Sequence, residues 1–183
     1  MNAFEDIVGR YLEEEGYWVR HSVKLNISKQ DKVALEKHSM PRPEIDIVAL
    51  NVCKNELLLL EVKSFLDSPY GVNYYEIIGE DKDAEKYDRY KLLTNIKFRD
   101  IVTKQLKREY IEKGLIKDSI MLRYGLAAGK IHSGHEDLLM KHFLKHRWVL
   151  ITPAQIKETL RKFSGKGYED DLVTVTAKLI MRK

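Results

Sequence analysis

Apolar residues recur along the chain at spacings that predict alternating helices and strands. Residues 3–15 carry apolar side chains at i, i+3, i+4, i+7 and i+8, namely Phe4, Ile7, Val8, Tyr11 and Leu12. This spacing is typical of one face of an amphipathic helix. Asn2 can cap the start of this helix and Gly16 its end. Residues 17–25 alternate weakly and predict a strand, while the polar, proline-containing stretch 26–43 predicts a loop or at most a short helix.

Two short apolar runs then surround a polar turn. The runs are residues 45–50 and 56–63, and the turn is residues 51–55. Apolar runs of this length, bounded by turn residues, are typical of strands. We therefore expect two adjacent strands joined by a tight connection.

Helical and strand patterns alternate through the rest of the chain. The expected elements are a long loop over 64–83, two helical pieces over 84–113 that part near Thr94 and Asn95, a strand over 119–130, a helix over 135–146, a strand over 148–151, a helix from Thr152 and Pro153 to about Phe163, and a final segment over 168–181. The final segment fits a helix or a strand, and we expect a helix. This order predicts an α/β fold with a mixed central sheet flanked by helices, in a single domain over 1–183.

Composition narrows the class of protein. A length of 183 residues suits one domain with a substantial core. The single cysteine, Cys53, excludes an internal disulfide and a cysteine-rich zinc site. No apolar stretch approaches the ~18 residues that a membrane helix needs, and the N-terminus lacks the pattern of a signal peptide. The expected location is the reducing cytoplasm.

Positive charge is concentrated in one segment. The whole chain has a formal net charge of +4, whereas residues 86–108 hold eight Lys or Arg against two Asp, a local excess of +6. Such a segment is an electrostatic footprint for a polyanion. Alternatively, it is a solvated helix face whose lysine stems cover apolar neighbours. The candidate nucleic-acid contacts are Lys97, Arg99, Lys104 and Lys107.

Two acids and a lysine stand at one end of the two central apolar runs. Asp46 opens the first run, and Glu61 and Lys63 end the second. Alternate residues of a strand share a face, so Glu61 and Lys63 point the same way and Val62 points to the opposite side. If the strands pair, Asp46 lies beside Glu61. Two carboxylates can hold a hard divalent cation such as Mg²⁺, with Mn²⁺ as a substitute, and the lysine can position a water beside it. The alternative is a structural salt bridge at the sheet edge.

This arrangement resembles the PD-(D/E)xK nuclease superfamily, whose pattern is an acid, a gap, and then acid-x-Lys. Residues 4–19 also look like the family's opening helix and first strand, and Glu5 occupies the position of a glutamate that reaches the metal site in many members. One departure concerns the position of the proline, because Pro43 directly precedes Glu44 rather than Asp46. The family's proline usually directly precedes its acid, whereas Pro43 stands three positions before Asp46.

The resemblance implies a three-layer restriction-endonuclease-like core and a Mg²⁺-dependent nuclease that acts on nucleic acid, with DNA as the expected substrate. Asp46, Glu61 and the backbone carbonyl of Val62 would ligate the metal, Lys63 would orient the attacking water, and Glu5 would complete the site. In many relatives a polar residue on the following helix supports the site, and Lys104 and Gln105 match it in outline; alternatively, they lie on an exposed helix face. Apart from the resemblance, Ser64 either contacts a phosphate through its hydroxyl or only ends the strand. A homodimer is compatible with cutting both strands of a duplex. The alternative function is a catalytically inactive nuclease fold that binds nucleic acid or serves as an assembly subunit.

Other catalytic classes find little support. His142 and His146 are four residues apart, as in some zinc sites, but no cysteine lies near them and no His-Glu-x-x-His string occurs. We expect these to be surface or partly buried histidines. The chain also lacks a Gly-x-Ser-x-Gly elbow and a phosphate-binding loop of the Gly-x4-Gly-Lys-Ser/Thr type.

Overall fold

The chain forms a five-stranded mixed sheet, as expected from the order of its elements. The computed structural model describes residues 2–36, 39–80 and 89–181. The strands follow the order β1-β2-β3-β4-β5, in which β1, β2 and β3 pair antiparallel and β3, β4 and β5 pair parallel. Their bounds are β1 (Trp18–Lys24), β2 (Glu44–Asn51), β3 (Glu56–Lys63), β4 (Met121–Ala128) and β5 (Val149–Ile151).

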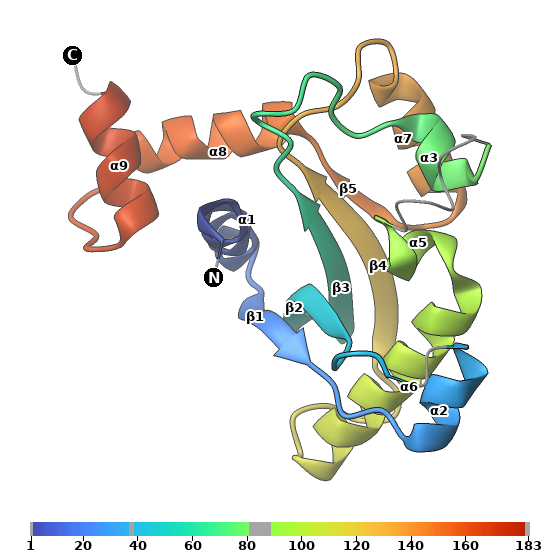
Figure 1. Cartoon of the computed structure of the whole chain (residues 1–183). Coiled ribbons are helices and arrows are strands. Elements are labelled where there is room, and N and C mark those ends of the chain that lie inside the picture. The colour runs from blue at the N-terminus through green and yellow to red at the C-terminus, as the bar shows by residue number, and fades with distance from the viewer. Residues whose placement is uncertain (1, 37–38, 81–88, 182–183) are drawn as a thin grey trace.

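Helices cover both faces of this sheet, which gives the α/β layering that the sequence predicts (Figure 1). Helices α1 and α8 lie against one face, α5 and α6 cover the other, α3 and α7 lie beside the β4–β5 edge, and α9 packs against α8 (Figure 1). In chain order the helices are α1 (Ala3–Glu14), α2 (Lys29–Ala34), α3 (Tyr74–Ile78), α5 (Lys91–Thr94), α6 (Ile96–Glu112), α7 (Glu136–Lys145), α8 (Pro153–Ser164) and α9 (Leu172–Met181).

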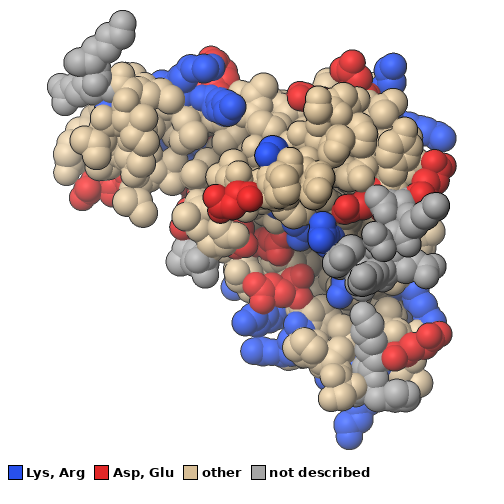
Figure 2. Space-filling view, turned by 45° about the horizontal axis from the view of Figure 1, so that its top comes forward, with Lys and Arg blue, Asp and Glu red and all other residues tan. Residues whose placement is uncertain are grey.

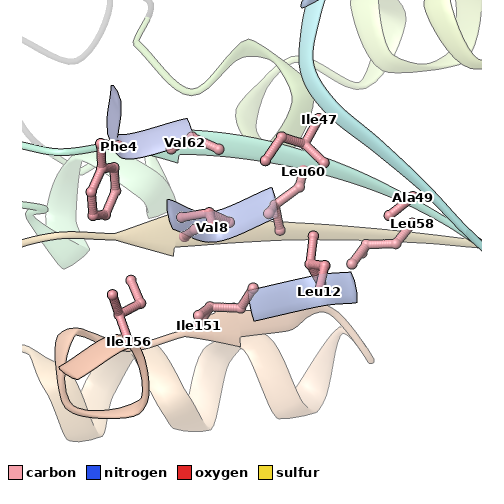
Figure 3. Close-up of a cluster of buried hydrophobic side chains, with 11 residues drawn as sticks. Phe4, Val8, Leu12, Ile47, Ala49, Leu58, Leu60, Val62, Ile151 and Ile156 are labelled. Carbon is pink, nitrogen blue, oxygen red and sulfur yellow. The ribbon is translucent and has the colours of Figure 1, made fainter. Parts of the chain in front are cut away.

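The central strand β3 is buried on both faces. Leu58 and Leu60 point toward α1, where they join a core that includes Val8 and Leu12 (Figure 3). Leu57 and Leu59 point the other way and pack with residues of α6. Burial on both faces explains why this strand is a continuous apolar run rather than an alternating one.

Most predicted elements are confirmed, with shifted ends. Asn2 caps α1 by accepting the Phe4 N–H at 3.0 Å, and Asn95 caps α6 by accepting the Phe98 N–H at 2.9 Å, so the helix break near Asn95 is real. The final segment is a helix, as expected. The prediction of an uninterrupted loop over 64–83 is wrong in one part, because Asn73 caps the short helix α3. Residues 84–88 of the predicted helical region lie outside the described residues.

Strands β2 and β3 separate near one end of the sheet. Their pairing runs from Asn51 opposite Glu56 to Ile47 opposite Leu60. Beyond that point β3 stays paired with β4, as far as Lys63 opposite Ala128. Over the same stretch β2 remains beside β1. The two central strands therefore form an open fork.

The backbone is irregular at the base of this fork. Ile45 packs in the core under α6, whereas Ile47 packs in the core under α1. Residues two apart in a regular strand share a face, so β2 turns between these two residues, at Asp46. On the neighbouring strand β1, Ser22 has a left-handed φ of +50°. Such backbone conformations are uncommon for residues other than glycine and are concentrated at functional sites.

Candidate functional site

The fork between β2 and β3 brings the three predicted residues together. Lys63 Nζ lies 3.8 Å from Asp46 Oδ2 and 3.6 Å from Glu61 Oε2. All three side chains are partly or largely shielded from solvent, with 25% exposure for Lys63, 27% for Asp46 and 11% for Glu61. The expectation that Asp46 lies beside the acid-x-Lys segment is confirmed.

The Asp46 carboxylate replaces a missing contact between the strands. Its Oδ2 accepts a hydrogen bond of 2.7 Å from the Val62 backbone N–H. In a continuous antiparallel ladder, a backbone carbonyl of β2 would satisfy an N–H that faces this strand. The Val62 side chain points away into the apolar core under α1. Val62 is thus at the site through its backbone, while its carbonyl as a metal ligand stays a prediction.

Glu61 has the most strongly shifted pKa among the acids of the site. Its Oε1 accepts the Leu92 N–H of α5 at 2.6 Å. Its Oε2 is buried and has no hydrogen-bond partner among the described residues. Burial raises the pKa of Glu61 from 4.5 to about 7, with the nearby Asp46 adding to the effect and the Lys63 charge opposing it. A buried carboxylate in this state is stabilised by a cation.

Glu5 reaches the same region from α1. Burial raises its pKa, and the negative charge of Asp46 raises it further. Its Oε2 is also buried without a hydrogen-bond partner in the described part of the chain. Glu5 is not among the residues that line the cavity next to Asp46. The glutamate is therefore electrostatically coupled to the site rather than placed in its opening.

A cavity of about 180 Å³ opens at the fork. Acidic and basic side chains gather close together near the middle of the face shown in Figure 2. The cavity is lined by Glu44, Ile45, Asp46, Glu61, Lys63, Arg89, Lys91, Leu92 and Phe98.

The backbone around Lys63 is held closely by β4. The Gly129 N–H donates to the Lys63 carbonyl at 2.9 Å. A Cβ atom at Gly129 would lie 2.4 Å from the Ser64 carbonyl oxygen, so only glycine permits this approach. Ser64 itself is half-buried directly after Lys63, and its expected phosphate contact stays a prediction.

The carboxylates of the site decide whether it suits a metal ion. Within residues 2–36, 39–80 and 89–181, no group of three or more His, Cys, Asp or Glu side chains is arranged to hold a metal ion. Mg²⁺, however, is commonly bound by one or two carboxylates and keeps several of its waters. Asp46 and Glu61 supply those carboxylates, and the buried Oε2 atoms of Glu61 and Glu5 accept no hydrogen bond from the described residues, although Lys63 Nζ lies 3.6 Å from Glu61 Oε2. These residues fit Mg²⁺ or Mn²⁺.

Asp46 and Glu44 have different contacts at the fork. Glu44 is exposed and its Oε2 pairs with Lys24 Nζ at 3.5 Å on the neighbouring strand. Asp46 instead bonds to the backbone beside Lys63. Both acids line the cavity, but only Asp46 makes an ion-pair contact with Lys63 among the salt bridges of the described residues.

The Arg99 side chain contacts other parts of the protein and does not belong to an open basic surface. Its Nη1 donates to the carbonyls of Leu92 and Leu93 at 3.3 and 3.1 Å. The guanidinium also lies 5.3 Å from the ring centroid of Tyr124 and 5.5 Å from that of Trp148. These contacts anchor α5 to the body of the protein.

The other basic candidates on α6 have different environments. Lys107 pairs with Asp118 at 2.7 Å, whereas Lys97 and Lys104 are exposed, seven residues apart on the helix. Seven residues correspond to about two helical turns, so Lys97 and Lys104 share a face of the helix. The structure thus places Lys97 and Lys104 together but separates Arg99 from them.

Gln105 does not line the cavity. Its Nε2 donates to Glu109 at 2.7 Å, and its Oε1 accepts from Arg108 at 2.5 Å. Both partners are on α6, so the amide is used within the helix. The ring centroid of His142 on α7 lies 4.5 Å from that of His146, the residue that follows the helix.

Sequence reasoning missed the positions of Arg89 and Lys91. Both belong to the basic segment 86–108, but neither was singled out as a site residue, and both line the cavity. The only sequence signal was their alternation with Tyr90 and Leu92, which are buried.

Comparison with known proteins does not identify a family. The chain matches no protein-family profile, no curated protein and no solved structure. The functional argument therefore depends on the geometry of Asp46, Glu61 and Lys63.

Proposed function

We propose that this protein is a metal-dependent nuclease that hydrolyses phosphodiester bonds, with DNA as the expected substrate. The observation that carries the proposal is the contact of one lysine, Lys63, with two carboxylates, Asp46 and Glu61, in an accessible cavity. A structural ion pair needs one acid for each base. Here Lys63 faces two acids and Glu5 is coupled to them, and burial disfavours the charged forms of Glu61 and Glu5, so a divalent ion at these carboxylates would offset that cost.

Each residue has a defined role in this proposal. Asp46 and Glu61 would bind the divalent ion through their carboxylate oxygens, and the Val62 carbonyl would be a further ligand. Glu5 would complete the site with a third negative charge. The ion, when bound, supplies Lewis-acid activation of water and phosphate. Lys63 holds the attacking water and stabilises negative charge that develops on the phosphate.

Backbone contacts support the two carboxylates. The Val62 N–H fixes Asp46, and the Leu92 N–H fixes Glu61. Carboxylates held by backbone donors lose little freedom on binding an ion, which favours a preorganised site. A homodimer and a cytoplasmic location stay predictions. No helix in the described part of the chain is both long and apolar enough to cross a membrane.

The test is a cleavage assay on several nucleic acids. Supercoiled plasmid and labelled single-stranded and duplex DNA and RNA are incubated with the purified protein in Mg²⁺, Mn²⁺, Ca²⁺ or EDTA. Cleavage in Mg²⁺ or Mn²⁺ that EDTA abolishes supports the proposal. Binding of nucleic acid without cleavage in either ion would instead indicate the inactive nuclease fold. Neither cleavage nor binding would reject both.

A further inference from the structure

Helix α9 is apolar on the face that it turns to solvent as well as on the face that it buries. Thr174 and Ala177 are buried where α9 packs against α8 and α1. Leu172 and Leu179 lie on the opposite side of the helix and keep 78% and 81% exposure. A helix that is apolar all round is normally covered on all sides. Among the described residues, no element covers the outer face of α9.

The exposed apolar side chains follow one line along α9. Residues three, four and seven apart lie close together on one side of a helix, and this spacing lets two helices pack side by side. The residues on this line are Leu172, Val175, Leu179 and Ile180. Tyr168, just before the helix, is 92% exposed. These five residues are called the α9 patch below, and the left end of the molecule, where α9 lies, shows mostly uncharged surface in Figure 2.

Charged side chains do not interrupt the α9 patch. Lys178 is the only charged residue of α9, and its Nζ donates to the Gly167 carbonyl. Of the acids just before the helix, Glu169 and Asp171 pair with Arg10 of α1, and Asp170 is exposed. A helix that lies on a membrane surface usually has a face rich in Lys and Arg. Helix α9 lacks such a face, so the patch favours an apolar protein surface as its partner.

An apolar groove of about 270 Å³ lies beside the patch, between α1, α8 and α9. Its walls include Ile7 of α1, Leu160 of α8 and Ile180 of α9, and Asp6 is the one charged residue in the lining that the described residues provide. One molecule thus presents both projecting apolar side chains and an apolar hollow. A two-fold contact uses the same surface on both subunits, so each copy would fill the hollow of the other.

The size of the patch fits a symmetric pair. With roughly 100 Å² of apolar surface for each aliphatic side chain and roughly 200 Å² for the tyrosine, scaled by their exposed fractions, the patch offers roughly 500 Å² per copy. Two copies would therefore bury about 1,000 Å², the area at which specific interfaces begin. A short ligand in the groove alone would leave most of the patch in contact with water.

We propose that α9 forms the interface of a homodimer, in which the α9 patch of one copy packs against the same patch of a second copy. The inference goes beyond the proposed function and does not depend on it. The groove beside α9 shares no lining residue with the cavity at Asp46, Glu61 and Lys63, so each copy would keep its own cavity.

Sedimentation velocity, over protein concentrations of about 1–100 μM, measures the mass in solution. The expected species has twice the 21.4 kDa of the chain. Leu172→Glu/Leu179→Glu should raise the dissociation constant of the dimer at least about a hundredfold, because each charge enters a symmetric apolar interface twice. Leu144→Glu is the matched control. Leu144 on α7 is 79% exposed, and its substitution should leave the dimer intact.

Two further variants separate loss of the interface from loss of the fold. Leu179→Glu alone changes one exposed residue and should also weaken the dimer. Leu172→Met/Leu179→Met keeps the apolar surface and should remain dimeric. Circular dichroism and thermal unfolding check that each variant is folded.

Three results would overturn the inference. They are a wild type that stays monomeric up to the highest concentration, folded Glu variants of the α9 patch that remain dimeric, and a dimer that only Leu144→Glu dissociates. A monomeric wild type that co-sediments with phosphatidylcholine vesicles would identify α9 as a membrane contact instead. Because mass is measured without nucleic acid, failure of the cleavage assay leaves this test unaffected.

Discussion

The Asp46 carboxylate accepts a 2.7 Å hydrogen bond from the Val62 backbone N–H on the adjacent strand. This contact lies where β2 and β3 stop pairing, beyond Ile47 and Leu60. Regular pairing would close the sheet at that point. The fork therefore opens a polar cavity at the end of strands that are otherwise apolar, and it orients Asp46 toward Lys63.

Glu61→Gln should stabilise the metal-free protein at alkaline pH. The pKa of Glu61 is raised from 4.5 to about 7, so its stabilising contribution is complete below pH 4.5 and is lost as the pH rises through 7. Glutamine is neutral and of similar shape. The variant should match the wild type near pH 4.5 and exceed it at pH 8 by up to about 3 kcal/mol in the free energy of unfolding.

Urea unfolding in EDTA at several pH values measures this difference. Glu44→Gln is the matched control, because Glu44 lines the same cavity but is exposed and paired with Lys24. It should show no comparable gain at pH 8. A Glu61→Gln variant that is less stable than the wild type at pH 8 would mean that the Lys63 ion pair outweighs the cost of burial.

Divalent cations should stabilise the protein more at pH 8 than at pH 6. Protons compete with the ion for Glu61, whose raised pKa lies between these two values. The melting temperature in Mn²⁺ and in EDTA, measured at both pH values, gives the comparison. Asp46→Asn should remove most of the Mn²⁺-dependent increase. An equal increase at both pH values, retained in Asp46→Asn, would place the ion elsewhere.

Lys63→Ala should lose cleavage but retain metal binding. A protonated lysine does not ligate a cation, and removing its charge relieves repulsion at the site. The expected loss is about 10²–10⁴ in rate. Calorimetric titration with Mn²⁺ and single-turnover cleavage measure the two properties. Loss of metal binding, or cleavage at the wild-type rate, would remove Lys63 from its proposed role.

Arg99→Gln and Lys97→Gln/Lys104→Gln should have different effects. Arg99→Gln removes donors to two carbonyls and contacts with two rings, so we expect a loss of about 1–3 kcal/mol in the free energy of unfolding. The exposed lysine pair should leave stability unchanged and weaken DNA binding with a shallower salt dependence. Unfolding curves and anisotropy distinguish these outcomes. Equal stability of all three proteins would contradict the structural role of Arg99.

The sequence predicted the site best where local periodicity is strong. The runs 45–50 and 56–63 specified two strands, and a period of two placed Glu61 and Lys63 on one face. Helix α1 was predicted equally well, because the spacing of its apolar residues and the capping residue Asn2 both indicate a helix that begins at Ala3. Hence the proximity of Asp46, Glu61 and Lys63 was predictable.

The remaining features depend on contacts between distant segments. The apolar residues give way to Asp46 and Glu61 where the pairing stops at Ile47 and Leu60, but this change of composition does not by itself indicate that the two strands separate. The positions of Arg89 and Arg99 depend on how α5 packs against the rest of the protein, which in turn depends on the burial of Tyr90 and Leu92. The short helix α3 was missed because its 5 residues are too few to show a helical spacing of apolar side chains.

The most direct test compares Asp46→Asn with Glu44→Gln in Mg²⁺-dependent DNA cleavage. Both variants remove a carboxylate charge from the same cavity, but only Asp46 contacts Lys63 and the Val62 N–H. The account predicts that Asp46→Asn is folded and lacks detectable cleavage, while Glu44→Gln cleaves at close to the wild-type rate. Full activity in Asp46→Asn would contradict the assignment of this site.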